Sequence, residues 1–114
     1  MGNMKDAYGF LKELAVNNNR EWFNARKETI YHPLRKAWEE DIARLLSLMN
    51  EYDDSLRGLR VNDCAYRIYR DIRFSADKSP YKNYFSAVLG KGGRKCVQAG
   101  YYLHMEPGNS GLHA

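Results

Sequence analysis

The most regular apolar pattern in the chain lies between residues 33 and 50. Six apolar side chains recur there at the spacing of one helical face: Leu34, Trp38, Ile42, Leu45, Leu46 and Met49. Pro33 stands at the start of the pattern, and proline is well tolerated at the first position of a helix. The pattern predicts a helix over 33–50 whose apolar face packs on another layer of the fold, while the charged residues between are solvated.

Two shorter helices are predicted before it, over about residues 6–16 and 20–31. The triplet Asn17-Asn18-Asn19 separates them. Asparagine tolerates left-handed backbone angles and also caps helix starts, so the triplet indicates that one helix stops and the next begins. The side chains expected to anchor both helices in the core are Phe10, Leu11, Leu14, Trp22 and Phe23.

After Gly58 the composition shifts toward β-branched and aromatic residues, which favour strands. Three antiparallel strands are therefore predicted, over about residues 64–74, 81–89 and 97–106. A loop over 75–80 would join the first two strands, and a glycine-rich turn over 90–95 would join the last two. Helices followed by strands indicate an α+β fold, and this length allows a single domain over residues 1–114.

Alternation along the predicted strand 64–74 assigns its residues to two sides. One side would be polar, with Arg67, Tyr69, Asp71 and Arg73. The other would face the core, with Ile68, Arg70, Ile72 and Phe74. A helix is the competing interpretation, because Arg67 and Arg70 are three residues apart and would then share a face with Asp71.

Basic residues are concentrated in the middle of the chain. Residues 57–95 carry ten Lys or Arg and three Asp or Glu side chains, whereas the whole chain has a net charge of +4. Such a local surplus can attract anions. No apolar run approaches the roughly 20 residues of a membrane helix, and neither a signal-peptide pattern nor a metal-type spacing of Cys64 and Cys96 is present. We therefore expect a cytoplasmic protein with reduced thiols, no membrane contact and no cofactor.

The segment between residues 67 and 81, the signature segment, combines charged and apolar residues at fixed spacing. The spacing R-x-x-R-D-x-R-F-x-x-x-[DN]-K-x-x-Y is formed by Arg67, Arg70, Asp71, Arg73, Phe74, Asp77, Lys78 and Tyr81. It resembles the signature of the domain of unknown function 2461 family, which is uncharacterised and mainly bacterial. Similar stretches at 10–12, 17–23 and 99–108 extend the resemblance to the end of the chain. Members usually have about twice this length, which implies that the chain is the N-terminal part of a longer family domain.

Arginine is permanently charged and presents planar, forked donors that grip phosphate or carboxylate groups. The sequence therefore predicts an anion-binding pocket for a small phosphorylated or carboxylated molecule. Its ligand-binding residues would be Arg67, Arg70, Asp71, Arg73, Lys78 and Tyr81. If the strand bearing His104 abuts these arginines, the imidazole could transfer protons near neutral pH and act catalytically. Whether a reaction is catalysed stays open. No metal site is predicted: His104 and Glu106 could supply two ligands and His113 a third, but no further ligand is identifiable.

Three alternatives remain for the basic middle of the chain. In the first, Asp71 and Asp77 neutralise Arg and Lys side chains in a structural network that binds nothing. In the second, a single-stranded nucleic acid stacks on the aromatic residues Tyr66, Tyr69, Tyr81, Tyr84 and Phe85. In the third, exposed strand edges make the chain a partner-binding or self-associating module, such as a homo-oligomer.

Overall fold

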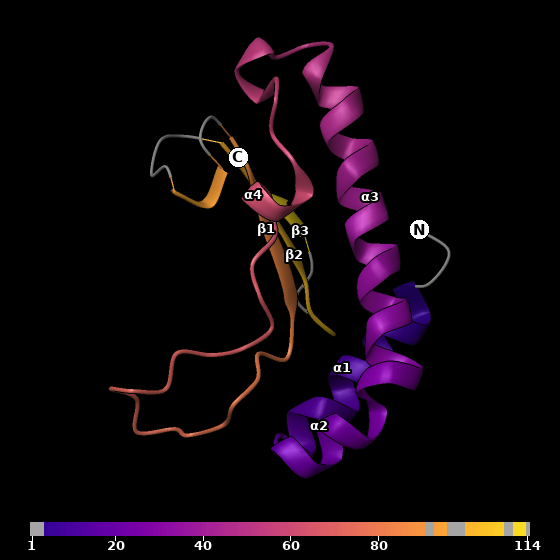
Figure 1. Cartoon of the computed structure of the whole chain (residues 1–114), viewed down its shortest axis with the longest axis vertical. Helices are drawn as coiled ribbons and strands as arrows, with labels where there is room; N and C mark the ends of the chain where they lie inside the picture. Colours follow the sequence, from indigo (N-terminus) through magenta and orange to yellow (C-terminus); the bar gives the residue numbers. More distant parts are fainter. Residues whose placement is uncertain (1–3, 91–92, 96–99, 109–110, 114) are drawn as a thin grey trace.

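The computed structural model describes residues 4–90, 93–95, 100–108 and 111–113. Its helices lie beside a small antiparallel sheet, so the predicted α+β class is confirmed (Figure 1). The three predicted helices are also present, as α1 (Met4–Val16), α2 (Arg20–Arg26) and α3 (His32–Asn50). The π-helical turn Lys27–Tyr31 joins α2 to α3, so the helix predicted over 20–31 has two parts.

The break between α1 and α2 is built by the asparagines predicted to form it. Asn17 follows the last residue of α1, and the Asn19 side chain caps α2 by accepting a hydrogen bond from Trp22 N at 2.8 Å. Asn18 forms hydrogen bonds with Tyr81, in a distant part of the chain. Its side chain donates to the carbonyl oxygen of Tyr81 at 2.8 Å and accepts from the N–H of Tyr81 at 3.0 Å. The helix break is thereby fixed against the chain that leads into the sheet.

The described strands form one sheet in the order β1-β2-β3, with both neighbouring pairs antiparallel. They are β1 (Phe85–Leu89), β2 (Tyr101–Met105) and β3 (Gly111–His113). Phe85 is paired with Met105, and Tyr102 is paired with His113. This register places His104 beside Ser86 of β1, on the opposite side of β2 from Leu103 and Met105.

The core lies between the helices and β1. Phe23 of α2 stacks on Tyr81 with ring centroids 4.1 Å apart, and Trp38 of α3 lies 5.8 Å from Phe85. The largest fully buried side chains are Phe23, Phe85, Leu11, Leu14, Ile42, Ile68, Leu89 and Cys64. Aromatic packing thus joins α2 and α3 to the sheet and to the end of the signature segment.

The strand predicted over 64–74 is wrong. Its first residue ends the short helix α4 (Val61–Cys64), and no regular strand follows within 65–74. Only two isolated bridges form in this part of the chain: Ala65 with Ala87, and Tyr69 with Tyr81. The competing interpretation as a helix is wrong as well, since the only helix in this stretch ends before Arg67.

The reason lies in the side chains that follow Arg70. Asp71 Oδ1 accepts a hydrogen bond from Arg73 N at 3.3 Å, and Lys78 Nζ donates to the carbonyl oxygen of Ile72 at 2.7 Å. Such local bonds offer the backbone an alternative to a ladder of strand hydrogen bonds. Phe74, which was predicted to face the core, is instead 95% exposed.

The other two predicted strands are present in shorter form. The strand predicted over 81–89 begins only at Phe85, and the strand predicted over 97–106 is Tyr101–Met105, with 97–99 outside the described residues. β3 was not predicted, because three residues are too few to show an alternating pattern. Within the described parts of the turn over 90–95, the residues Gly93–Lys95 form a 3₁₀ turn.

Two expectations drawn from composition concern the thiols and the membrane. Cys64 is buried, and burial is the main cause that raises the pKa of its thiol, while Cys96 lies outside the described residues. A buried thiol of raised pKa is a poor nucleophile. Among the described segments, no helix combines the length and the apolar composition of a membrane span.

Candidate functional site

Arg70 closes the loop between residues 70 and 79. Its Nη1 donates to the carbonyl oxygen of Ser79 at 2.8 Å and lies 3.4 Å from Asp77 Oδ2, while its Nη2 donates to Ser75 Oγ at 3.4 Å. All three contacts lie within the loop, as in the structural network that the sequence left open. The donors of this guanidinium are therefore largely occupied by the protein itself.

Asp71, Arg73 and Lys78 of the predicted site also contact their own loop. Arg73 Nη2 lies 2.9 Å from Asp71 Oδ2, and the hydrogen bonds from Arg73 lower the pKa of Asp71 to about 2. Both side chains are exposed. Lys78 Nζ donates a hydrogen bond to the carbonyl oxygen of Ile72. The structure therefore does not bring Arg70, Arg73 and Lys78 together around one cavity.

Tyr81, the last residue of the predicted site, is part of the core. Its ring is buried against Phe23, and its backbone is held by the side chain of Asn18. Burial is the main cause that raises the pKa of its hydroxyl. The ring thus anchors the end of the signature segment.

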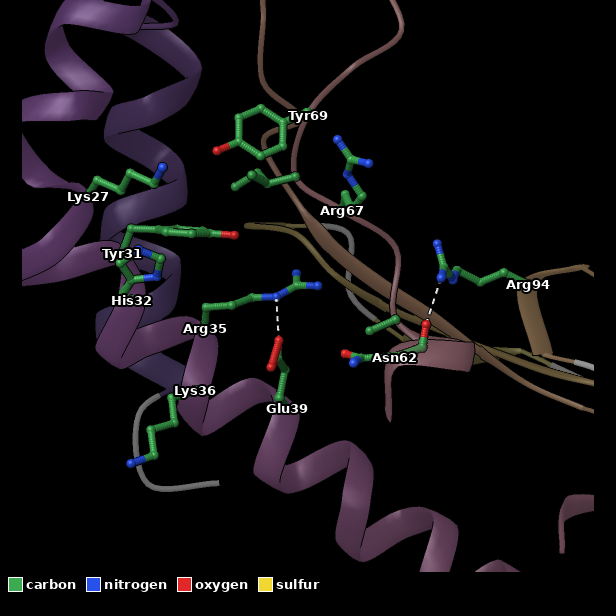
Figure 2. Close-up of a pocket in the computed structure, with 12 residues that line it drawn as sticks. Lys27, Tyr31, His32, Arg35, Lys36, Glu39, Asn62, Arg67, Tyr69 and Arg94 are labelled. Carbon is green, nitrogen blue, oxygen red and sulfur yellow. Dashed lines mark hydrogen bonds and ion pairs between the residues drawn. The ribbon is translucent and has the colours of Figure 1, made fainter. Parts of the chain in front are cut away.

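Arg67 lines a cavity of about 730 Å³ between the start of α3 and the segment 62–69, the basic cleft (Figure 2). The charged residues that line it are Lys27, Arg35, Lys36, Arg67, Arg94 and Glu39. Five cationic side chains accompany one carboxylate, so the potential in the cleft is positive at neutral pH. Figure 2 shows Arg35 and Arg67 on opposite sides of the cleft, with Lys36 at the rim and turned away from both.

Arg35 is held rigidly in this cleft. Its Nε lies 3.2 Å from Glu39 Oε2, and its Nη2 donates to the carbonyl oxygen of Tyr66 at 2.7 Å. The guanidinium carbon lies 5.4 Å from the ring centroid of Phe85, and the side chain is only 12% exposed. The Nη1 atom is buried and has no hydrogen-bond partner in the part of the chain that the structure describes. One end of a fixed guanidinium is thus a buried donor without an acceptor.

Two tyrosines add hydroxyl groups to the lining. Tyr31 is buried, and its hydroxyl points into the basic cleft (Figure 2). Burial raises the pKa of Tyr31 to about 12, so the group stays a hydrogen-bond donor at neutral pH. Tyr69 is 43% exposed, and the guanidinium carbon of Arg67 lies 5.7 Å from its ring centroid. The cleft therefore offers neutral donors and an accessible ring beside its cations.

Arg94 reaches the basic cleft because Gly93 lets the 3₁₀ turn Gly93–Lys95 approach α4. Gly93 has a φ of +61°, and a Cβ at this position would collide with the carbonyl oxygen of Asp63. Arg94 Nη2 then donates to the carbonyl oxygen of Asn62 at 2.6 Å. The glycine is thus required for the placement of the cation.

The pKa of Lys82 is a second indication of the positive potential. It is lowered first by burial and then by the charges of Arg35, Arg67 and Arg94. The ammonium of Lys82 packs on another side chain, with Nζ 5.4 Å from the ring centroid of Tyr66. The charges of the basic cleft therefore act on a group that is not part of its lining.

His104 lies on β2 and does not line the basic cleft. Its Nδ1 is 2.9 Å from the hydroxyl of Tyr102, and its Nε2 is 2.7 Å from Glu106 Oε1. The ring of Tyr84 packs on the imidazole, with centroids 4.6 Å apart, and Tyr84 also lines a smaller cavity with Arg70. Of the predicted arginines, Arg70 thus lines a cavity together with a tyrosine that packs on His104. Within the described ranges, no group of three or more His, Cys, Asp or Glu side chains is arranged to hold a metal ion.

Sequence reasoning found Arg67 but not the residues that accompany it in the basic cleft. The charged residues of α3 were assigned to a solvated face. Arg35 follows Leu34 and precedes Trp38 by three positions, so it borders the apolar stripe. A charged residue at this border, with Glu39 four positions later, was the available signal for a half-buried ion pair.

Comparisons with known proteins give a family and nothing more specific. No curated protein and no solved structure matches the chain. The family model described as conserved hypothetical protein (DUF2461) matches residues 6–114, which include the whole signature segment and the basic cleft. The chain therefore belongs to the DUF2461 family.

Proposed function

We propose that the basic cleft binds a small anionic molecule that carries a phosphate or carboxylate group. The observation that carries this proposal is the Nη1 of Arg35, which has no partner among the described residues, on a guanidinium that Glu39 and the carbonyl of Tyr66 hold in place. A buried donor without a partner costs roughly 1–3 kcal/mol. An anionic oxygen at Nη1 would remove this cost and gain a charge-assisted hydrogen bond.

The surroundings of Arg35 support the same proposal. Arg35 comes from α3, Arg67 from the segment after α4 and Arg94 from the 3₁₀ turn, so cations from three elements line one cavity. Its volume of about 730 Å³ is that of a small-molecule site. The hydroxyl of Tyr31 adds a donor, and the single carboxylate of Glu39 is already engaged by Arg35.

This proposal keeps the predicted ligand class and moves the site. Arg67 remains a ligand-binding residue. Four other predicted ligands, Arg70, Asp71, Arg73 and Lys78, are assigned to the folding of their own loop, because their side chains contact loop atoms. The cations that replace them in the site, Arg35 and Arg94, lie outside the signature segment.

Two observations favour a small molecule over a larger partner. Of the five aromatic residues considered for nucleic-acid stacking, Tyr81 and Phe85 are buried in the core, which removes much of a stacking platform. Self-association through strand edges is disfavoured at β1, because part of its edge already pairs with the chain itself: Tyr66 N donates to the carbonyl oxygen of Ser86 at 2.9 Å.

The experiment is a thermal-unfolding titration of the chain with inorganic phosphate, sulfate, sugar phosphates, nucleotides and dicarboxylates. A ligand at 100 times its Kd should stabilise the chain by about 2.7 kcal/mol, which raises Tm by roughly several degrees for a domain of this size. Arg67→Gln and Arg94→Gln should each weaken this effect at least about tenfold in Kd, the loss of one charge-assisted contact. Arg73→Gln removes an exposed cation outside the basic cleft and should leave the Kd unchanged.

Two outcomes would reject the proposal. The first is the absence of saturable stabilisation by any of these anions in the parent chain. The second is an equal weakening by Arg73→Gln and Arg67→Gln, because binding would then follow the total charge of the protein rather than the geometry of the basic cleft.

A further inference from the structure

Three polar side chains of the sheet form a connected row that the basic cleft does not use. Tyr102, His104 and Glu106 occupy alternate positions along β2 and its continuation, so they share one face. Leu103 and Met105, on the other face, belong to or pack against the hydrophobic core. The row is half-buried, with the side chain of His104 14% exposed.

The hydrogen bonds of this row define the state of the imidazole. A carboxylate can only accept, so Nε2 of His104 must carry the proton that it donates to Glu106 Oε1 at 2.7 Å. In the neutral ring the other nitrogen, Nδ1, is then a bare acceptor. It lies 2.9 Å from the hydroxyl of Tyr102, which is the donor. Two consecutive hydrogen bonds thus connect a hydroxyl to a base, and the base to a carboxylate that orients it.

We propose that Tyr102, His104 and Glu106 form a proton relay that activates the Tyr102 hydroxyl as a nucleophile towards a small, negatively charged ester or thioester. The order of groups is that of activated nucleophiles in general, in which the base contacts the nucleophile and a third group orients the base. Tyr102 is the catalytic nucleophile, His104 is the base and Glu106 is a positioning residue. The relay is independent of ligand binding in the basic cleft.

The reaction can be written with these groups alone. The Tyr102 oxygen bonds to the carbonyl carbon of the ester while its proton passes to His104 Nδ1. Glu106 stabilises the imidazolium through the proton on Nε2. The bond from the carbonyl carbon to the leaving oxygen or sulfur then breaks, and the leaving group takes the electron pair and the proton from Nδ1. The products are an acyl-tyrosine and an alcohol or thiol, and water releases the acid from the acyl-tyrosine by the same route.

The negative charge of the substrate is inferred from the cavity beside the relay. Tyr84 packs on the imidazole and lines a cavity of about 290 Å³ with Arg70 and Lys82. The pKa of Tyr84 is raised by burial and then by Tyr102 and Glu106, and it is lowered by Arg70. Tyr84 therefore lies within electrostatic range of both the relay and a cation. Arg70 is paired with Asp77, which also lines this cavity, so Lys82 is the cation that a negatively charged substrate there would meet.

The test is the reaction of the chain with p-nitrophenyl hemisuccinate, a charged ester. Release of p-nitrophenolate gives the rate, and peptide mass spectrometry locates the succinyl group. Tyr102 should be acylated about 100-fold faster than Tyr52, in line with the contribution of a positioned general base; Tyr52 is 89% exposed and serves as the internal reference. His104→Gln should reduce the rate at Tyr102 to that of Tyr52. The neutral ester p-nitrophenyl acetate should react with Tyr102 more slowly than the charged one.

Equal acylation of Tyr102 and Tyr52, or an unchanged rate in His104→Gln, would overturn the relay. An acetate ester that reacts as fast as the hemisuccinate would overturn the assigned charge of the substrate. A separate measurement needs no variant: the ¹⁵N chemical shifts of His104 should show the neutral tautomer with its proton on Nε2, and a proton on Nδ1 would contradict the proposal. Glu106→Gln should keep this tautomer, because an amide oxygen still accepts, whereas Glu106→Ala should allow both.

Discussion

At the level of single residues, the three arginines of the signature segment have different surroundings. Arg67 lines the basic cleft, Arg70 is bonded to three groups of its loop, and Arg73 is exposed and paired with Asp71. Three side chains with the same guanidinium group therefore have three different roles, because their burial and their neighbouring acceptors differ. Of the three, Arg67 alone lines the basic cleft, where Lys27, Arg35, Lys36 and Arg94 accompany it.

The pair of Asp71 and Arg73 gives a prediction for acid titration. The side-chain hydrogen bond from Arg73, followed by the backbone hydrogen bond, lowers the pKa of Asp71 from 3.8 to about 2. Because the folded-state pKa is below the unfolded one, this pair contributes to stability above pH 4 and the contribution is lost as the pH falls through about 2. A ¹³C titration of the Asp71 carboxyl group should show this low midpoint, and Arg73→Gln should return it toward the ordinary value.

Arg70→Gln is the matched control for this titration. It removes the same charge from the same loop, but Arg70 contacts Asp77 and not Asp71. The midpoint of Asp71 should therefore stay low in this variant. If both variants moved it equally, the low pKa would reflect the general positive charge of the loop rather than the hydrogen bonds from Arg73.

At the level of elements, the break between α1 and α2 has a prediction of its own. Asn18→Ala removes two hydrogen bonds to the backbone of Tyr81 and leaves part-buried groups without partners, so it should destabilise the chain by about 1–3 kcal/mol. Asn17→Ala removes only an exposed hydrogen bond to Glu13 and should change stability by less than about 0.5 kcal/mol. Urea denaturation of both variants measures the difference, and equal costs would show that the contact with Tyr81 contributes nothing.

The elements that could be predicted from the sequence are those whose signals are local. α3 was predicted because apolar residues at helical spacing leave one face to bury, and the asparagine triplet marked a break that its own side chains build. The strand over 64–74 failed because its residues satisfy two strand criteria, composition and alternation, but not the third, a continuous ladder. Ala65 and Tyr69 form only isolated bridges, with Ala87 and Tyr81. Asp71 and Lys78 occupy backbone groups that such a ladder would need.

At the level of the whole molecule, the basic cleft shows what a sequence cannot reveal alone. Its lining comes from the π-helical turn, α3, the segment 62–69 and the 3₁₀ turn that carries Arg94. Each cation in these segments looks like a solvated surface charge until the fold brings them together. Arg67 was singled out because its neighbours in sequence are also charged, although the groups that line the cleft with it, such as Tyr31 and Arg35, come from elsewhere in the chain.

The two phenylalanines Phe23 and Phe74 separate the parts of the chain that hold the fold from the parts that do not. Phe23 is fully buried and stacks on Tyr81, so Phe23→Ala should leave a cavity where α2 meets the signature segment and destabilise the chain by about 3–5 kcal/mol. Such a loss is a large fraction of the roughly 5–15 kcal/mol that stabilises a typical domain.

Phe74→Ala makes the same chemical change on a side chain that is 95% exposed, and it should alter stability by less than about 0.5 kcal/mol. Urea denaturation of the two variants tests this, and a large cost at Phe74 would mean that its ring is buried in solution. If Phe74 is dispensable for stability, its place in the signature segment reflects something other than the folding of this domain.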